Sequence, residues 1–245
     1  MSRWKAAGIH LAISAIAGIA VAILLLRVWY PSPWSIALGA NKLLLLIEAG
    51  LALGPLLTLV VFKSGKKGML FDLVFIAIVQ LAVLAYGLSL AARSRPVFVV
   101  AAVDRFVVVS AAEIDPADLA AAELPQFRSL SWIGPRIVGT RIPEDVEARN
   151  RILFSAVAGK DIDKYPQHYV DYGSVAKDML SRARPLAALT PPANETTTLA
   201  QAVAEDGGAD HLAWMPIVAS KANLVMLLDR NLSEPPRPVA VTSPE

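Results

Sequence analysis

The sequence predicts an α+β membrane protein: an N-terminal three-helix transmembrane bundle followed by one α+β domain with an antiparallel sheet. Three apolar stretches of about twenty residues each predict the bundle, because about 20 helical residues cross the hydrocarbon layer of a bilayer. They cover residues 10–29, 43–62 and 69–91. A soluble helix needs only one apolar face, so a soluble core does not explain them. Short β-rich runs and helical patterns alternate in the rest of the chain, which is typical of an α+β domain.

The charge of the chain changes sign at the end of the third stretch. Residues 1–95 carry a net charge of +7, whereas residues 96–245 carry −5. We therefore expect a three-span membrane domain at 1–95 and a soluble domain at 96–245 that can bury its own core. Four prolines near the C-terminus predict a disordered tail at about 234–245. An acidic domain without a basic patch argues against a nucleic-acid partner.

Cations precede the first span and follow the second, so they lie on the same side of the membrane domain. These residues are Arg3, Lys5, Lys63, Lys66 and Lys67. Since the loops richest in Lys and Arg stay in the cytoplasm, we expect the loop Tyr30–Asn41 and the C-terminal domain to lie outside it. Aromatic residues at span ends predict an interfacial belt of Trp4, Trp29, Tyr30 and Trp34.

Small residues recur at four-residue spacing in the first two spans. The first stripe is Ser14, Gly18 and Ala22, and the second is Gly50, Gly54 and Thr58. Such stripes let helix backbones approach closely in lipid, where the hydrophobic effect does not draw helices together. Two interpretations stay open: packing among the three helices of this chain, or a groove for the transmembrane helix of a partner.

Four polar or helix-breaking residues stand out inside the spans. Glu48 lies about 9 Å below the outer boundary of the second span, where a carboxylate must be paired, protonated or snorkelled. Arg27 is its expected partner within the chain, and a structural pair and a partner-binding role are both open. Gln80 can donate hydrogen bonds across a helix interface. Pro55 lacks a backbone N–H and predicts a kink.

The soluble domain is expected to begin with the β-rich run Val97–Ser110, which Asp104 and Arg105 interrupt. That run forms one long bent strand or two short ones. A helix from Pro143 has the clearest amphipathic pattern of this domain and ends near Gly159. Further expected elements are a short helix from Asp115-Pro116, a strand near Arg136–Thr140, helices near Val175–Ala183 and Thr197–Glu205, and a hairpin of His211–Ala219 with Asn223–Asp229.

Motifs that carry chemistry are nearly absent. The chain has no cysteine, and its three histidines are dispersed without metal-ligand spacing. It has no glycine-rich phosphate loop and no nucleophile elbow. We therefore expect no catalytic residue, no cofactor site and no metal site, and a protein that is not an enzyme.

Several strings together resemble a known family, the type IV pilin accessory proteins, also called TfpX/TfpZ-like. They are MSRWKAAGIHLAIS at the start, VWYP at 28–31, GPLLTLVVFKSGKKG at 54–68, FDL at 71–73, RPVFVVAAVDRF at 95–106 and LFSAVAGKDID at 153–163. The resemblance covers nearly the whole chain. It departs most near the C-terminus, where a usual glycine-bearing turn is replaced by Arg230–Pro236.

This resemblance implies a bacterial inner-membrane protein with its soluble domain in the periplasm and a non-enzymatic, chaperone-like role. It implies a cognate major pilin as partner, besides the lipid bilayer and other pilus assembly proteins. Residues expected to contact the pilin are Ser14, Gly18, Ala22, Arg27, Glu48, Gly50, Gly54, Pro55, Thr58, Gln80, Asp104 and Arg105. Two alternatives stay open: a membrane enzyme acting on prepilin or lipid through an acid such as Asp72 or Asp161, and a membrane sensor or scaffold.

Overall fold

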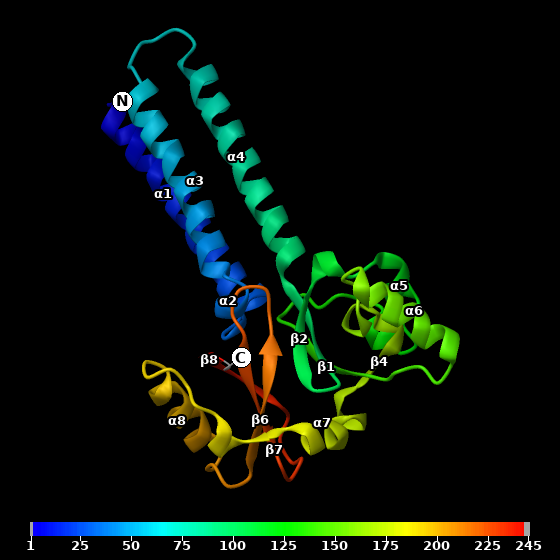
Figure 1. Cartoon of the computed structure of the whole chain (residues 1–245). Helices are drawn as coiled ribbons and strands as arrows, with labels where there is room; N and C mark the ends of the chain where they lie inside the picture. Colours follow the sequence, from blue (N-terminus) through cyan, green and yellow to red (C-terminus); the bar gives the residue numbers. More distant parts are fainter. Residues whose placement is uncertain (1, 243–245) are drawn as a thin grey trace.

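The computed structural model describes residues 2–242 and begins with three long helices (Figure 1). The first is α1 (Arg3–Ile23), which continues into the π-helix η1 (Leu24–Trp29). It is followed by α3 (Ala40–Val61) and α4 (Met69–Ser94). All three are long and apolar enough to cross a membrane, which confirms the three predicted stretches. We call α1, η1, α3 and α4 the helical unit.

The N-terminus and the α3–α4 loop lie at one end of the helical unit, and the rest of the chain lies at the other (Figure 1). Helix α3 packs against both α1 and α4. Their shared core includes Leu25 of η1, Ile47 and Leu51 of α3, and Ala91 of α4. The hydroxyl of Tyr30 donates to the carbonyl of Ala91 at 2.7 Å and so ties the end of the first span to α4.

A one-turn helix, α2 (Trp34–Ala37), joins the first two spans and inserts into the core of the following domain. The backbone N–H groups of Lys221 and Ala222 donate to the carbonyl of Ala37 at 3.1 and 3.3 Å. The helical unit is therefore attached to the rest of the protein at two places, through α2 and through the end of α4.

The predicted aromatic belt is largely wrong. Trp29, Tyr30 and Trp34 are buried, with at most 6% of each residue exposed, because they fill the junction between the two parts of the protein. Trp4 alone among the four is exposed.

Residues 96–242 form a domain around one sheet, which we call the sheet domain. Its strands are β1 (Pro96–Ala102), β2 (Arg105–Ser110), β3 (Arg136–Thr140), β4 (Tyr169–Asp171), β5 (Arg184–Pro185), β6 (Leu212–Val218), β7 (Leu224–Asp229) and β8 (Arg237–Thr242). Their order is β4-β3-β1-β2-β6-β7-β8, and β5 pairs with β6. The sheet domain begins two residues after α4 ends at Ser94.

The α+β class is confirmed, but the sheet is mixed rather than antiparallel throughout. The hairpins β1–β2 and β6–β7 are antiparallel, as expected. The pairs β1–β3 and β2–β6 are parallel. Parallel strands need a long connection. For the pair β1–β3 it is the chain between β2 and β3, and for the pair β2–β6 it is the chain between β2 and β6.

Alternation along β1 separates two cores on the two faces of the sheet. Val99 and Ala101 pack with Trp34 of α2, whereas Phe98 and Val100 pack with residues of the β2–β3 connection. A third cluster lies between β6, β7, β8 and helix α8.

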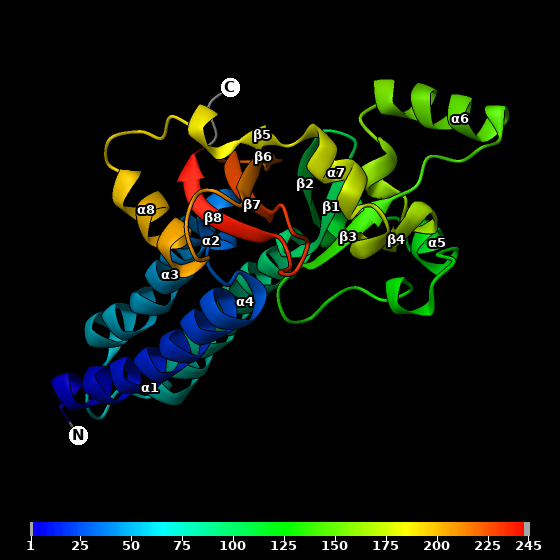
Figure 2. The same ribbon diagram turned by 90° about the horizontal axis from the view of Figure 1, so that it is seen from below.

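The helices of the sheet domain are α5 (Pro116–Ala120), α6 (Val146–Val157), α7 (Ala176–Arg182) and α8 (Thr196–Glu205). Aspartates cap the first two: Asp115 accepts from the N–H of Ala117, and Asp145 accepts from the N–H of Ala148. The sequence predicted the first cap, but α6 begins at Val146 and not at Pro143 as expected. Helix α6 lies at the edge of the sheet domain, away from the helical unit (Figure 2).

The disordered tail predicted at about 234–245 needs correction at 237–242. Residues Arg237–Thr242 form β8, which pairs with β7. Val239 and Val241 are buried in the third core cluster, and this burial holds the strand in place. Its proline, Pro238, is tolerated because β8 is an edge strand. Residues 243–245 lie outside the described residues.

Candidate functional site

Four polar side chains meet between the three long helices, and we call them the polar seam. They are His10 and Ser14 of α1, Thr58 of α3 and Gln80 of α4. His10 lies 2.7 Å from both its partners, with Nδ1 facing the Thr58 hydroxyl and Nε2 facing Oε1 of Gln80. Nε2 of Gln80 donates to Oγ of Ser14 at 3.1 Å. The polar seam thus links all three helices.

A second bond of Gln80 follows directly from the proline in α3. Pro55 cannot donate a hydrogen bond to the carbonyl four residues earlier, which belongs to Leu51. Nε2 of Gln80 donates to that carbonyl instead, at 2.8 Å. Because a carbonyl only accepts, this bond fixes the orientation of the Gln80 amide and turns its oxygen toward His10. Nε2 of His10 then donates to the Gln80 oxygen, and Nδ1 faces the Thr58 hydroxyl.

Glycines create the space for these polar groups. A Cβ atom at Gly54 would overlap the Gln80 side chain, and one at Gly18 would overlap the carboxylate of Glu48. Both glycines are buried in the packed helical unit. The four-residue stripes predicted from the sequence therefore include two positions where a side chain of a neighbouring helix fills the missing volume.

The expected ion pair between Arg27 and Glu48 is not formed. Among residues 2–242, Glu48 makes no ion pair and no hydrogen bond, and its carboxylate rests against Gly18. Arg27 is nine residues further along the first helix, a rise of about 14 Å, and its side chain is exposed. Antiparallel packing of α1 and α3 thus sets Glu48 opposite the middle of α1 rather than its end.

The two small-residue stripes pack within the protein itself. Ser14 and Thr58 are 6% and 1% exposed, and a Cβ atom at Gly50 would lie 3.1 Å from Val83 of α4. Ala22 is half-buried. These positions therefore lie inside the helical unit, and Pro55 is buried with them.

Helix α4 leaves most of its apolar surface uncovered. Only Ile76 and Ala91 of its 26 residues are buried, compared with six of the 22 residues of α3. Exposed side chains of α4 include Leu70, Phe71, Phe75, Ile78, Leu81 and Tyr86. This surface is available to lipid or to a partner helix.

In the sheet domain, Asp104 and Arg105 lie at the turn between β1 and β2, where they form a loose ion pair at 3.7 Å. The residue before them, Val103, has a φ of 55°, and its carbonyl accepts from Arg182 of α7 at 2.9 Å. Arg105 also lines a cavity of about 330 Å³ whose opposite wall is α6. The sequence did not place α6 beside this turn.

Helix α6 has no buried residue among its twelve. Three of its apolar side chains are strongly exposed: Leu153 is 66% exposed, Phe154 77% and Val157 89%. The sequence predicted an apolar face here, but the protein does not cover it. On the floor of the cavity, burial raises the pKa of Asp163, and the carboxylate of Asp161 raises it further.

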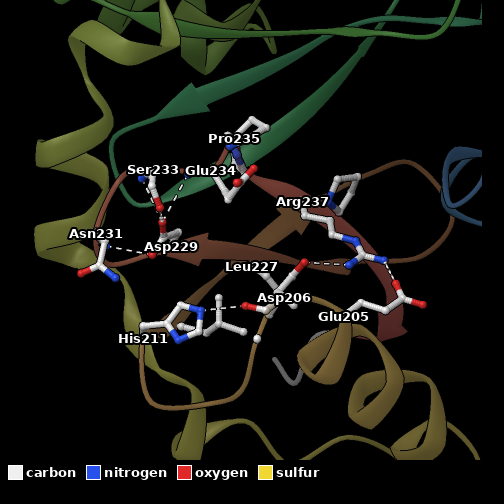
Figure 3. A pocket seen from close by; sticks show the side chains of 14 residues that line it. Glu205, Asp206, His211, Leu227, Asp229, Asn231, Ser233, Glu234, Pro235 and Arg237 are labelled. Atoms are coloured by element: carbon white, nitrogen blue, oxygen red, sulfur yellow. Dashed lines mark hydrogen bonds and ion pairs between the residues drawn. The ribbon is translucent and has the colours of Figure 1, made fainter.

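A depression of about 780 Å³ in the sheet domain contains charged side chains that satisfy one another (Figure 3). Arg237 pairs with Asp206 at 2.7 Å and also with Glu205. Asp229 accepts from the hydroxyl of Ser233 at 2.5 Å and from backbone N–H groups of the β7–β8 connection. These bonds lower the pKa of Asp229 to about 2. The arrangement shapes a turn and joins α8 to β8.

No group of three metal-ligating side chains occurs within residues 2–242. The acids considered for catalysis are far apart in the fold and engaged locally. Asp72 pairs with Lys66 of the α3–α4 loop at 2.5 Å, and Asp161 accepts from the N–H of Ile162 at 2.6 Å.

Sequence reasoning found Gln80 but missed His10, although the spacing of His10, Ser14 and Gly18 places all three on one face of a helix. It also missed that α6 is uncovered, since periodicity identifies an apolar face without indicating what packs on it.

The fold and the polar seam define a class: a small membrane protein with three spans and a mixed-sheet domain attached to one end of them. The profile of the family described as fimbrial assembly protein FimB matches residues 1–39. The chain belongs to this fimbrial assembly protein family.

Relatives from Dichelobacter nodosus support this assignment over most of the chain. The fimbrial assembly protein of serogroup E1 is 33% identical over 186 residues, which cover 75% of this chain and 72% of the relative. The protein of serogroup I has the same identity and coverage. That of serogroups C1 and C2 is 34% identical over 125 residues, covering 50% of this chain and 92% of the relative. No solved structure is significantly similar to the chain.

Proposed function

We propose that this protein is a type IV pilin accessory protein of the TfpX/TfpZ kind, which binds its cognate major pilin and supports pilin stability and pilus assembly. Family membership supports a role in fimbrial assembly. The observation that carries the pilin-binding part is the bare apolar surface of α6. A helix of twelve residues is marginal without tertiary packing, and lipid does not cover a helix that lies beyond the spans.

The globular head of the pilin would cover α6 and the cavity between α6 and the β1–β2 turn. That cavity offers apolar walls from Ile152 and Leu153 and charged groups from Arg105 and Arg149. An apolar centre with charged groups at its rim is the usual composition of a protein–protein interface. In this proposal Asp104 and Arg105 keep the partner-binding role predicted for them.

The apolar N-terminal helix of the pilin would rest on the uncovered face of α4. The predicted contact residues in the stripes, such as Gly18 and Gly54, lie between the protein's own helices. In this proposal these stripe residues and the polar seam together fix the position of α4. Covering the pilin helix in the membrane keeps it from aggregating before polymerisation, and this role needs no catalytic group.

We place the protein in the bacterial inner membrane with its N-terminus in the cytoplasm and the sheet domain in the periplasm. The cations near the N-terminus and in the α3–α4 loop are at the end of the helical unit away from the sheet domain, which supports this orientation (Figure 1). The chain has no cysteine, so single cysteines can report sidedness. Ser64→Cys should resist a membrane-impermeant thiol reagent added to cells with a permeabilised outer membrane, whereas Ser220→Cys should react. The reverse pattern would overturn the orientation.

Co-purification of the cognate pilin with the full-length protein tests the proposal. Phe154→Ser and Leu153→Ser should each lower the affinity about 30-fold, which corresponds to about 2 kcal/mol, the scale of an interface hot spot. Because both side chains are exposed, the stability of the accessory protein should stay within about 0.5 kcal/mol of the parent. Leu232→Asn, on the β7–β8 connection, is the matched control for an exposed apolar residue and should leave recovery unchanged.

If the α6 variants recover as much pilin as the parent protein, α6 is not the pilin-binding surface. The enzyme alternative has its own test: Glu48→Gln, Asp72→Asn and Asp161→Asn should each retain both pilin recovery and pilus assembly. Loss of assembly in one of these stable variants would favour a membrane enzyme.

A further inference from the structure

Two arginines line a depression of about 600 Å³ at the junction of the helical unit and the sheet domain. They are Arg95, directly after α4, and Arg136, at the start of β3. The remaining wall is the segment 129–133 of the β2–β3 connection, which includes Trp132 and Ile133.

This depression lies at the ends of the spans. The N–H of Gly134 donates to the carbonyl of Val28, in the last turn of the first span, at 2.8 Å. The rings of Trp132 and Trp29 are 6.3 Å apart. Gly134 has a φ of 58°, and a Cβ atom there would lie 3.2 Å from Pro31. The segment is thus fixed closely against the end of the first span.

The positive charge in the depression has no counter-ion within residues 2–242. Arg95 is only 8% exposed, yet its guanidinium donates just to two backbone carbonyls, Ser131 at 3.3 Å and Ala92 at 2.5 Å. Arg136 likewise donates to backbone carbonyls, those of Gln126 and Ser129. A buried cation is costly without an anion, and each guanidinium has N–H donors left over.

The rim of the depression is apolar and open. Trp132 is 66% exposed and Ile133 78% exposed, while the guanidinium of Arg95 lies 4.8 Å from the centre of the Trp132 ring. Tryptophan is enriched at the level of the headgroups because its ring is amphipathic. The expected belt residues Trp29 and Trp34 are buried, so among the described residues Trp132 is the exposed tryptophan at this end of the spans.

We propose that this depression binds the phosphate of an anionic phospholipid headgroup, with Arg95 and Arg136 as its ligands and Trp132 and Ile133 inserted at the headgroup level. Arginine suits this role because its planar fork of N–H donors matches the oxygens of a phosphate. A free phosphate ion offers the same oxygens, but it does not cover the apolar rim. The lipid therefore explains both the unpaired charge and the exposed side chains.

Native mass spectrometry of the full-length protein, released from bilayers of phosphatidylglycerol or phosphatidylcholine, tests the proposal. The parent protein should retain phosphatidylglycerol, and Arg136→Gln should lower its affinity about tenfold, equivalent to about 1.4 kcal/mol. Arg93→Gln is the matched control, because Arg93 is an exposed arginine at the end of α4 that does not line the depression. Equal retention in the two variants would overturn the site.

Two further arms separate the lipid from its alternatives. Inorganic phosphate at millimolar concentration should not displace phosphatidylglycerol, and displacement would indicate an ion site instead. A nitroxide on Ile133→Cys, unique in this cysteine-free chain, should be more accessible to oxygen than to a water-soluble nickel chelate in phosphatidylglycerol bilayers. A fully aqueous signal at this position would contradict insertion and overturn the proposal.

Discussion

Replacing Gln80 with leucine removes the side chain that joins all three helices. Gln80 bonds to His10, to Ser14 and to the carbonyl of Leu51. Hydrogen bonds between membrane helices are worth on average about 0.6 kcal/mol each, so Gln80→Leu should destabilise the protein by about 2 kcal/mol. Leu81→Ala, which changes an exposed neighbour on the same helix, should cost less than about 0.5 kcal/mol.

The proline provides a sharper form of this prediction. Pro55→Ala restores an N–H that can reach the carbonyl of Leu51 within α3, so this carbonyl no longer depends on Gln80. The cost of Gln80→Leu should therefore be smaller in the Pro55→Ala background, by about 0.6 to 1.7 kcal/mol. Reversible unfolding in mixed micelles, followed for the parent, both single variants and the double variant, measures this coupling.

An additive result would refute the reasoning. If Gln80→Leu costs the same amount in both backgrounds, the bond from Gln80 to Leu51 contributes nothing measurable to stability. The cost of Gln80→Leu in the parent shows whether the assay is sensitive enough. The exposed-residue control, Leu81→Ala, separates a general effect on α4 from a loss in the polar seam.

Three other substitutions test single features of the fold. Gly54→Ala should destabilise the helical unit by about 1 to 3 kcal/mol in the same unfolding assay, because the new Cβ atom overlaps Gln80. The control Gly8→Ala should be neutral or stabilising, because a Cβ atom at Gly8 has no neighbour within 4 Å. Tyr30→Phe should cost about 1 to 2 kcal/mol because the Ala91 carbonyl loses its buried donor. The low pKa of Asp229, about 2 in the folded protein, contributes stability that is present above pH about 4 and is lost as the pH falls toward 2. Asp229→Asn should therefore flatten the stability of the protein across this pH range, and an unchanged slope in acid unfolding would contradict the assignment.

Local signals in the sequence predicted the elements that local chemistry determines. Asp115 followed by proline gave a capped helix. The interruption at Asp104-Arg105 allowed either one long bent strand or two short ones, and the structure has two. The apolar lengths gave three spans. Each of these features depends on residues close together in the chain, so spacing and residue type are enough.

Features that depend on tertiary contacts were not predictable in the same way. The bond between Gln80 and the Leu51 carbonyl needs the register of α4 against α3, which small-residue spacing does not supply. Prolines near the C-terminus suggested disorder, but burial of Val239 and Val241 against β7 outweighs them in β8. The same limit applies to Glu48, whose neighbour is set by helix packing and not by the nearest opposite charge.

The polar seam also limits how the pilin can be recognised. Its donors and acceptors are used within the helical unit. The side chains of Gln80 and Glu48 also fill the space beside Gly54 and Gly18, so a pilin helix has access only to outer surfaces such as that of α4. The seam should then influence pilin binding only through the position of α4. Pilin recovery should fall in Gln80→Leu and rise again in the Pro55→Ala double variant to the extent that stability returns. A double variant that regains stability without regaining recovery would instead place Gln80 in direct contact with the pilin.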